Sequence, residues 1–265
     1  MDNEVETKKS LGQHWLSDAD TLEAICDLAD IEPGDTILEI GPGLGSLTAM
    51  LLKKTKQVVA VEFDDSLQDQ LQSRFKSEPS IRFYFEDIRR FNLTLLPANY
   101  KLVANIPYYI TSYLVRLISE SANQPAVAVL LIQKEVADRL VAQPGNLSVL
   151  GVIAQSYWRI EAGPIVGPEK FTPPPKVNSQ VVRMTRLKQP RLPIGEEKQF
   201  IHLVRICFGQ KRKNLLNNLS GGLHIDRLKA QAILESAALK PTKRPQELSI
   251  EDWLRLHEAI SKPGE

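Results

Sequence analysis

Cysteine is scarce in this chain of 265 residues, which contains only two, Cys26 and Cys207. Both are isolated, and no Cys-x-x-Cys pair occurs. The four histidines show no spacing typical of metal ligands. The sequence therefore predicts no structural metal and a reducing, cytoplasmic environment.

Long apolar runs are also missing. The longest, Ala126–Ile132, is far shorter than the roughly 18 residues that indicate a membrane span. The polar start Met1-Asp2-Asn3-Glu4 does not resemble a signal peptide. With 43% hydrophobic and 25% charged residues, the composition is that of a globular protein. We expect a soluble protein with one large or two modest domains.

The chain has almost no net charge, +1, but its charge is unevenly distributed. Residues 186–265 carry 15 Lys and Arg against 9 Asp and Glu, a net charge of +6. Residues 1–185 carry 18 against 23, a net charge of −5. The basic tail fits either a nucleic-acid-binding face or an ordinary solvated surface, and charge alone does not decide between them.

Strand and helix patterns alternate over the first two-thirds of the chain. Short apolar segments rich in β-branched residues predict buried parallel strands at Thr36–Ile40, Gln57–Glu62, Ile81–Phe85, Tyr100–Ile106 and Ala126–Gln133. Apolar residues three or four apart predict helices at Asp18–Leu28, Leu44–Lys54, Ser66–Phe75, Thr111–Ser119 and Lys134–Val141. The pattern indicates a doubly wound α/β sheet, with a further strand at Val177–Leu187.

The pattern becomes wholly helical after the linker Gln189–Pro193. Helices are expected at about Glu196–Phe208, Arg212–Leu219, Arg227–Ala237 and Ile250–Ile260. We therefore predict a catalytic domain over residues 1–187 and a small all-helical domain over residues 188–265.

A glycine loop, Glu39-Ile40-Gly41-Pro42-Gly43-Leu44-Gly45, joins the first of these strands to a helix. Such loops let the backbone approach a nucleoside ligand, and they occur in dinucleotide sites too. Ser46 stands where a Gly-x-Gly-x-x-Gly motif needs Gly or Ala, and the observed spacing is that of methyltransferases. Glu62, at the end of the second strand, can accept hydrogen bonds from ribose hydroxyls. Asp87, just past the third strand, can accept from an adenine amine or cap a helix.

The tetrapeptide Asn105-Ile106-Pro107-Tyr108 follows the fourth strand and opens onto the same carboxyl edge as the glycine loop. An aromatic amine is a poor nucleophile because its lone pair is delocalised into the ring. If Asn105 Oδ1 and the Ile106 carbonyl accept its two N–H bonds, the lone pair is directed at a methyl donor. Tyr108 can stack on the base. Alone, the tetrapeptide is more typical of a strand end followed by a turn.

Taken together, these motifs resemble the KsgA/RsmA family of small-subunit (16S) ribosomal RNA adenine dimethyltransferases along nearly the whole chain. The first five segments that carry the resemblance are Lys9–Leu16, the glycine loop, Glu62, Asp87 and Asn105–Tyr108. Three further segments lie outside the shared methyltransferase fold and are specific to these enzymes: Gln133–Leu140, Phe171–Ser179 and Phe208–Lys213.

The resemblance implies a Rossmann-like class I S-adenosylmethionine-dependent methyltransferase sheet with a small helical C-terminal domain. It implies S-adenosylmethionine as donor and S-adenosylhomocysteine as product. The substrate would be two adjacent adenosines in the 3′-terminal stem-loop of the rRNA, methylated on a 30S assembly particle. We expect a monomer that binds neither metal nor membrane.

The resemblance also implies roles for particular residues. Those expected to bind the cofactor are Gln13, His14, Leu16, Glu39, Gly41, Gly43, Glu62, Asp87 and Asn105. Asn105, Ile106, Pro107 and Tyr108 would act at the target amine, with Phe171 as a second stacking wall for a flipped adenine. Lys176, Lys211, Arg212 and Lys213 would contact RNA, with Lys240, Lys243 and Arg244 on the same surface.

The chain departs from the family pattern at two places. Ser148-Val149 stands where a Tyr-Gly pair is usual, and Trp15 replaces the more frequent Phe. Three other functions stay open: an Erm-type methyltransferase of large-subunit rRNA, a non-catalytic ribosome assembly or transcription factor, and a nicotinamide oxidoreductase.

Overall fold

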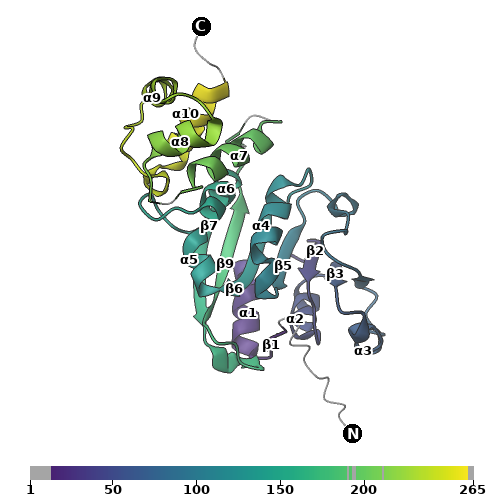
Figure 1. Ribbon diagram of the computed structural model, residues 1–265. Coiled ribbons are helices and arrows are strands. Elements are labelled where there is room, and N and C mark those ends of the chain that lie inside the picture. Colours follow the sequence, from purple (N-terminus) through teal and green to yellow (C-terminus); the bar gives the residue numbers. More distant parts are fainter. Residues whose placement is uncertain (1–12, 190, 193–194, 211, 262–265) are drawn as a thin grey trace. The chain divides into compact units, whose positions relative to one another are not determined.

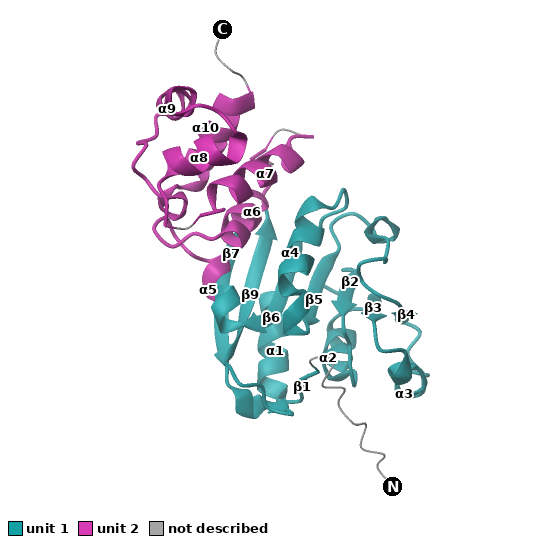
Figure 2. Cartoon of the chain, viewed as in Figure 1, with its two compact units in different colours: residues 1–137, 159–186 teal, residues 138–158, 187–265 magenta. Residues whose placement is uncertain are grey.

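The computed structural model describes residues 13–189, 191–192, 195–210 and 212–261. It consists of two compact units (Figure 2): unit 1 contains residues 1–137 and 159–186, and unit 2 contains residues 138–158 and 187–265. Lys9–Gly12 of the N-terminal motif, Pro190 and Pro193 of the linker, and Lys211 lie outside the described residues. Among the helices described, none combines the length and the apolar content needed to cross a bilayer.

Unit 1 is built on a seven-stranded sheet with the order β4-β3-β2-β5-β6-β9-β7 (Figure 1). The strands are β2 (Ile37–Ile40), β3 (Val58–Glu62), β4 (Ile81–Phe85), β5 (Lys101–Asn105), β6 (Val127–Gln133), β7 (Trp158–Val166, its first residue assigned to unit 2) and β9 (Ser179–Arg186). The first five in spatial order are parallel, and β9 is antiparallel to β6. The structure thus confirms the predicted α/β architecture.

The strand order reverses direction between β2 and β5, which are neighbours although about 60 residues separate them in sequence. Ile37 pairs with Lys101, and Glu39 pairs with Val103. From β2 the chain winds outward through β3 and β4, and from β5 it winds the other way through β6. Ligands of open α/β sheets bind outside the carboxyl ends of the strands at such a switch point.

The helices of unit 1 alternate with these strands. They are α1 (Ala19–Leu28), α2 (Ser46–Lys54), α3 (Gln68–Arg74), α4 (Thr111–Glu120) and α5 (Lys134–Leu140), of which the last crosses the unit boundary. Single 3₁₀ turns are η2 (Asp65–Leu67), η3 (Leu93–Leu95), η4 (Tyr108–Ile110) and η5 (Pro168–Lys170). Helix α1 begins where the Asp18 carboxylate accepts from Thr21 N at 3.1 Å, because that bond satisfies an otherwise unpaired N–H of the first turn.

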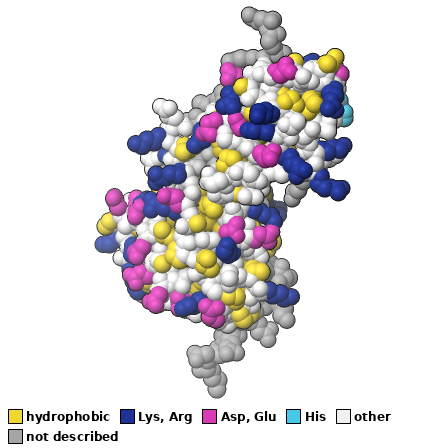
Figure 3. Space-filling model, turned by 90° about the vertical axis from the view of Figure 1, so that its left-hand side faces the viewer, with side chains coloured by type: hydrophobic (Ala, Val, Ile, Leu, Met, Phe, Trp, Pro, Cys, Tyr) yellow, Lys and Arg dark blue, Asp and Glu magenta, His cyan; other side chains and the backbone are white. Residues whose placement is uncertain are grey.

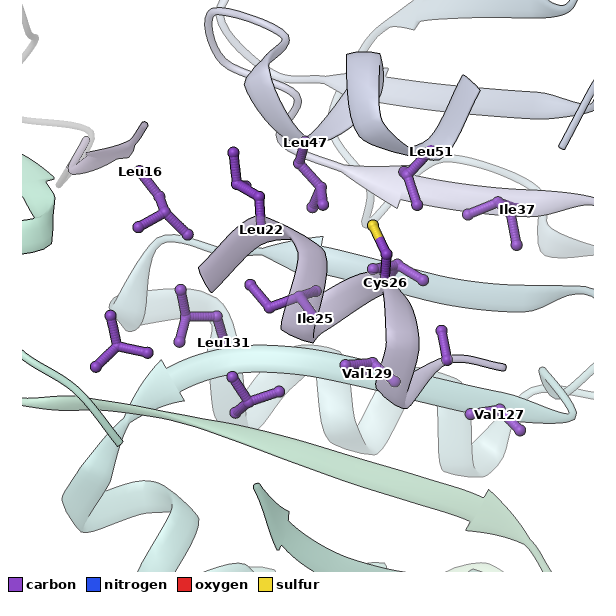
Figure 4. Packing of buried hydrophobic residues seen from close by; sticks show 14 of the residues in the cluster. Leu16, Leu22, Ile25, Cys26, Ile37, Leu47, Leu51, Val127, Val129 and Leu131 are labelled. Atoms are coloured by element: carbon purple, nitrogen blue, oxygen red, sulfur yellow. The ribbon is translucent and has the colours of Figure 1, made fainter. Parts of the chain in front are cut away.

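One face of the sheet is covered by α1 and α2 (Figure 4). Leu22, Ile25 and Cys26 of α1 pack in one cluster with Val129 and Leu131 of β6. The alternate β6 residues, Ala128, Leu130 and Ile132, are equally buried, so both faces of this strand are covered. This explains why the strand reads as a continuous apolar run rather than an alternating one.

Two short strands form a separate antiparallel pair, β1 (Trp15–Leu16) with β8 (Phe171–Thr172). Leu16 pairs with Phe171, and both side chains are buried in the same apolar cluster. The pairing fixes the chain just before α1 beside the glycine-loop end of the sheet, since Trp15 also approaches Gly43.

Unit 2 is mainly helical. It contains α6 (Val149–Tyr157), α7 (Glu197–Cys207), α8 (Leu215–Leu223), α9 (Arg227–Ser236), the 3₁₀ turn η6 (Pro245–Glu247) and α10 (Ile250–Ser261). Trp253 of α10 is fully buried, with its ring stacked on Phe208 at a centroid distance of 5.7 Å. The structure also assigns residues 138–158 to this unit, whereas the sequence-based division at residue 187 would assign them to the first domain.

Candidate active site

A pocket opens at the carboxyl ends of β2 and β5, within unit 1. Its empty volume, counting its open mouth, is about 840 Å³. Its walls are formed by Gln13, His14, Trp15, Leu16, Leu22, Gly41, Pro42, Gly43, Leu44, Ser46, Leu47, Glu62, Phe63, Asn105, Ile106, Pro107, Tyr108 and Tyr109. The glycine loop and the Asn105–Tyr108 segment therefore border one hollow. A Cβ built on Gly41 would lie 3.9 Å from the Asn105 carbonyl oxygen.

The glycine loop adopts backbone conformations that favour glycine. Gly41, Gly43 and Gly45 have φ values of +69°, +56° and +81°, in the left-handed region where side chains other than glycine are strained. A Cβ on Gly43 would also lie 3.3 Å from the Trp15 ring, so the loop and the indole pack closely. Trp15 thus serves as the aromatic contact of the loop at the position where the family more often has Phe.

Glu62 is buried beside this loop, with only 6% of its surface exposed. Its Oε2 accepts from Gly43 N at 3.0 Å, and its Oε1 accepts from Asp64 N at 2.8 Å. Burial raises the pKa of Glu62, while these backbone N–H groups favour its charged form. The carboxyl group is thereby held at the pocket wall with free lone pairs for further donors.

The amide of Asn105 is oriented by one hydrogen bond, from its Nδ2 to the His14 carbonyl oxygen at 3.3 Å. Because Nδ2 is engaged, Oδ1 is the amide atom that can accept from a ligand in the pocket. Ile106, which follows directly, also lines the pocket. The structure therefore places in one pocket the two residues expected to receive an amine.

Tyr108 is held between two neighbours. Its hydroxyl shares a hydrogen bond with Ser179 Oγ at 2.7 Å, and its ring is stacked on His14 at a centroid distance of 5.7 Å. Burial raises the pKa of the phenol, so it stays protonated at neutral pH. His14 in turn contacts the Pro173 carbonyl oxygen through Nδ1 at 2.8 Å. These contacts fix the ring that is expected to stack on a base.

Gln13 binds on the glycine-loop side of the pocket, where its Nε2 donates to Asp64 Oδ2 at 2.9 Å. Asp64 also donates its backbone N–H to Glu62. Gln13, His14 and Leu16 thus all line the pocket, as expected for cofactor-binding residues of the N-terminal motif.

Two predicted site residues do not line this pocket. Asp87 pairs with the Arg89 guanidinium and accepts from Arg89 N at 2.9 Å, and the Arg89 side chain holds the pKa of the Asp87 carboxyl below its usual range. Phe171 is 4% exposed in the apolar cluster with Leu16. A stacking role for Phe171 requires its ring to leave that cluster, and a cofactor contact by Asp87 has to be made beside or in place of the Arg89 guanidinium.

Glu39 is a third predicted site residue outside the pocket wall, and the second of those expected to bind the cofactor. Its side chain is fully buried; Oε2 accepts from Thr48 Oγ1 at 2.7 Å, and Oε1 has no hydrogen-bond partner among the described residues. Burial raises the pKa of Glu39 from 4.5 to about 8, with the charge of Glu62 adding to the shift. The carboxyl group is therefore mostly protonated at pH 7.

This protonation predicts a pH-dependent stability. Between about pH 5 and pH 8 the folded state keeps a proton that the unfolded chain has released, so the free energy of unfolding falls as the pH rises. Glu39→Gln retains an acceptor for Thr48 and removes the titration. The variant should gain stability relative to wild type by about 1 kcal/mol per pH unit across this range. Urea unfolding at pH 5.5 and pH 8 measures it, with exposed Glu78→Gln as control. If the free energy of unfolding of Glu39→Gln differed from that of wild type by the same amount at both pH values, the raised pKa of Glu39 would be contradicted.

The cations expected to contact RNA lie at the surface. Lys176, Arg212 and Lys213 are exposed, and Lys211 falls outside the described residues. In unit 2, the buried Asn218 donates from Nδ2 to the carbonyl oxygens of Gln210 at 3.2 Å and Lys213 at 3.3 Å. These bonds hold the backbone at Gln210 and at Lys213 against α8.

Some pocket residues were not identified from the sequence. They are Leu22, Pro42, Leu44, Ser46, Leu47, Phe63 and Tyr109. Phe63 and Tyr109 follow Glu62 and Tyr108 directly and are exposed aromatic residues, 53% and 64%. That adjacency is a signal in the sequence, but exposure at the pocket mouth is visible only in three dimensions.

The wall of this pocket suits a nucleoside. Glu62 supplies a carboxylate beside a glycine loop with no side chains in the way, and Leu16, Leu22 and Leu47 supply an apolar surface. Within the part of the chain that the structure describes, no group of three or more His, Cys, Asp or Glu residues is arranged to bind a metal. The Glu62 carboxylate, which can accept hydrogen bonds beside the glycine loop, fits an organic cofactor with ribose hydroxyls.

Comparisons with known proteins agree with this geometry. The family model described as ribosomal RNA adenine dimethylase matches residues 4–262. The chain is 39% identical to a Ribosomal RNA small subunit methyltransferase A of Dehalococcoides mccartyi over 255 residues, which cover 95% of this chain and 88% of that protein.

Two solved structures are similar along almost their whole length. A dimethyladenosine transferase from Plasmodium falciparum gives a TM-score of 0.82 at 26% identity, covering 94% of this chain and 98% of that one. The 23S rRNA methyltransferase ErmE gives 0.73 at 28% identity, covering 93% and 99%. These likenesses confirm the predicted Rossmann-like class I methyltransferase fold. By the extent of these matches, the chain belongs to the ribosomal RNA adenine dimethylase family.

Proposed function

We propose that this enzyme transfers methyl groups from S-adenosylmethionine to the N6 amines of two adjacent adenosines in the 3′-terminal stem-loop of small-subunit (16S) rRNA. The observation that carries the proposal is the shared pocket of Gly41, which follows β2, and Asn105, which ends the neighbouring strand β5. The name of the curated relative, a small-subunit methyltransferase, supports the choice of rRNA. We propose that the substrate is a 30S assembly particle, and that the monomeric protein acts in the cytoplasm.

The cofactor would be held by the glycine loop, Glu62 and the N-terminal segment at Gln13–Leu16. When bound, S-adenosylmethionine supplies an electrophilic methyl group. Glu62 would accept hydrogen bonds from the ribose hydroxyls. Each such charge-assisted hydrogen bond contributes about 1.5–3 kcal/mol to binding. Gly41 and Gly43 allow the backbone to approach the ligand because they carry no side chain.

Asn105 and Ile106 act on the substrate amine. Asn105 Oδ1 and the Ile106 carbonyl accept its two N–H bonds and direct the nitrogen lone pair toward the methyl group. As the new N–C bond formed and the bond from the methyl carbon to the cofactor sulfur broke, S-adenosylhomocysteine would leave, and the positively charged nitrogen would then release one proton toward solvent. Both acceptors stabilise that developing charge, and no side chain has to remove a proton first. Tyr108 stacks on the adenine and keeps it in this orientation.

The RNA would contact exposed cations, some of which belong to unit 1 and others to unit 2. Lys176 lies in unit 1, and Arg212 and Lys213 lie in unit 2. The Leu215 N–H donates to the Lys243 carbonyl oxygen at 2.7 Å, so the loop with Lys240, Lys243 and Arg244 adjoins the start of α8. Figure 3 shows several Lys and Arg side chains on the visible face of the unit that carries the C-terminus, interspersed with Asp and Glu. Such a surface binds phosphates through counterion release.

Mass spectrometry of rRNA from separated 30S and 50S particles, each incubated with the protein and S-adenosylmethionine, tests the function. We expect two neighbouring N6,N6-dimethyladenosines in small-subunit rRNA. Methylation of large-subunit rRNA instead would indicate an Erm-type activity, which the similarity to ErmE makes the natural alternative. Binding to the particles without any methylation would indicate a non-catalytic assembly factor.

A further inference from the structure

The helix that follows the Asn105–Tyr108 segment exposes a face of aromatic and basic side chains. Tyr109 in η4 and Tyr113 and Arg116 in α4 are spaced by four and three residues, which places them on one side of a continuous helical stretch. The residues between them, Leu114 and Val115, are fully buried. We call Tyr109, Tyr113, Arg116 and the adjacent Arg89 the tyrosine–arginine face.

These side chains are in contact or close to one another. The Arg116 guanidinium carbon lies 5.9 Å from the centroid of the Tyr113 ring. Arg89 is in the loop after β4, and its pKa is raised mainly by Asp87, with smaller contributions from Tyr113 and Tyr109. Arg89 and Arg116 remain 59% and 40% exposed. Cations over aromatic rings of this kind are common platforms for nucleobases and phosphates.

The face is hollowed at its far end. Tyr113 and Arg116 line a shallow depression together with Phe91, Asn92 and Thr94, with an empty volume of about 580 Å³ counting open solvent. It offers an aromatic wall, a cation and small polar groups, which are the features that receive an unpaired base.

The same face begins at the pocket described above. Tyr109 lines the Asn105 pocket and is 64% exposed. Tyr113 follows one helical turn later, and four residues of helix correspond to a rise of about 6 Å. A strand whose target base enters the pocket therefore has stacking surfaces for its next nucleotides at a spacing that suits an extended chain.

Resting on the function proposed above, we propose that the tyrosine–arginine face binds the RNA nucleotides that flank the adenosine being methylated. Flipping the target base unstacks its neighbours, and Tyr109 and Tyr113 replace the lost stacking. Arg89 and Arg116 are paired with Asp87 and Glu120 in the free protein, at the surface where such pairs are weak. RNA phosphates can therefore exchange for these carboxylates, and the exposed Arg90 adds a further cation.

Steady-state methylation of 30S particles by single variants tests this proposal. Tyr113→Ala should raise KM for the RNA substrate about tenfold with kcat within about twofold of wild type, because stacking outside the reacting base contributes binding only. Tyr113→Phe keeps the ring and should restore KM. Arg116→Gln should raise KM about fivefold. It should also reduce, by about one, the magnitude of the slope of log(1/KM) against the logarithm of the salt concentration.

Arg159→Gln is the matched control. Arg159 is an exposed arginine in unit 1 that is also paired with a glutamate, Glu161, but it lies on β7 at the opposite edge of the sheet from β4. It should leave KM and the salt slope unchanged. Cofactor binding by calorimetry and the thermal midpoint check that each variant is folded.

An unchanged KM in both Tyr113→Ala and Arg116→Gln overturns the proposal, as does an equal loss in Arg159→Gln. If Tyr113→Ala does not fold, the exposed Arg116 variant decides alone through its KM and salt slope. Failure of the wild-type protein to methylate 30S particles would instead refute the function itself, and this inference with it.

Discussion

Asn105→Ala is expected to lower kcat by about 10²- to 10³-fold while changing the dissociation constant of S-adenosylmethionine by less than about fivefold. In the proposed function the amide Oδ1 is the acceptor that directs the amine, so its loss would be felt as the new N–C bond forms. Cofactor affinity is expected to depend mainly on the glycine loop and Glu62. Single-turnover methylation and calorimetry of cofactor binding measure the two quantities independently.

Asn105→Asp serves as the control for this change. The Asn105 Nδ2 donates to the His14 carbonyl oxygen, so the alanine variant also loosens the N-terminal segment. Aspartate keeps oxygen acceptors at this position but loses that donor, so it should retain more kcat than alanine if the acceptor is what matters. Parallel losses of kcat and cofactor affinity in the alanine variant would refute the role at the amine.

Glu62→Ala should weaken S-adenosylmethionine binding by about 10- to 100-fold, with kcat at saturating cofactor reduced only a few-fold. The lost carboxylate accounts for about 1.5–3 kcal/mol of charge-assisted hydrogen bonding to ribose hydroxyls. The change also leaves Gly43 N and Asp64 N without their acceptor, so part of the loss comes from a loosened loop. Calorimetric titration measures the affinity.

Glu62→Gln separates these two contributions. The side-chain carbonyl still accepts one backbone N–H, but the charge and one acceptor are gone. An affinity between those of wild type and Glu62→Ala is expected. Wild-type affinity in both variants would show that Glu62 does not contact the cofactor.

Much of the fold was predictable because burial produces plain sequence patterns. The parallel strands and most helices were found within four residues of their observed ends. The pairing of the glycine loop with Asn105 was predicted because both follow strands, and the carboxyl ends of parallel strands meet at one edge. What the sequence did not show was that β2 and β5 are direct neighbours.

The segments that escaped prediction have physical reasons. Strand β7 contains Gly163 and Pro164, which argue against a central strand. However, β7 lies at the edge of the sheet and has a neighbouring strand on one side only, so the backbone N–H that proline lacks is not needed there for strand pairing. Helix α6 is apolar on most sides, so it lacks the polar face that reveals a helix. Strands β1 and β8 have two residues each, too few for any pattern.

Site residues were harder to place than elements, because the sequence does not show which local partner a side chain takes. Asp87 pairs with Arg89, two residues away in sequence. Phe171 is buried in the core beside Leu16, its partner in the β1–β8 strand pair. Glu39 precedes the glycine loop in sequence yet is turned into the interior, where Thr48 is its partner. Their roles in catalysis and cofactor binding stay predictions.

The paired hydrogen bonds that Glu62 receives from Gly43 and Asp64 have a thermodynamic consequence. An unrestrained glutamate loses about 0.5–1.5 kcal/mol of rotamer freedom when a ligand immobilises it. Here the backbone has already ordered the side chain during folding, so an arriving ribose does not incur that loss. Tight binding of a nucleoside would then depend on the positions of the Gly43 and Asp64 N–H groups as much as on the carboxylate of Glu62 itself.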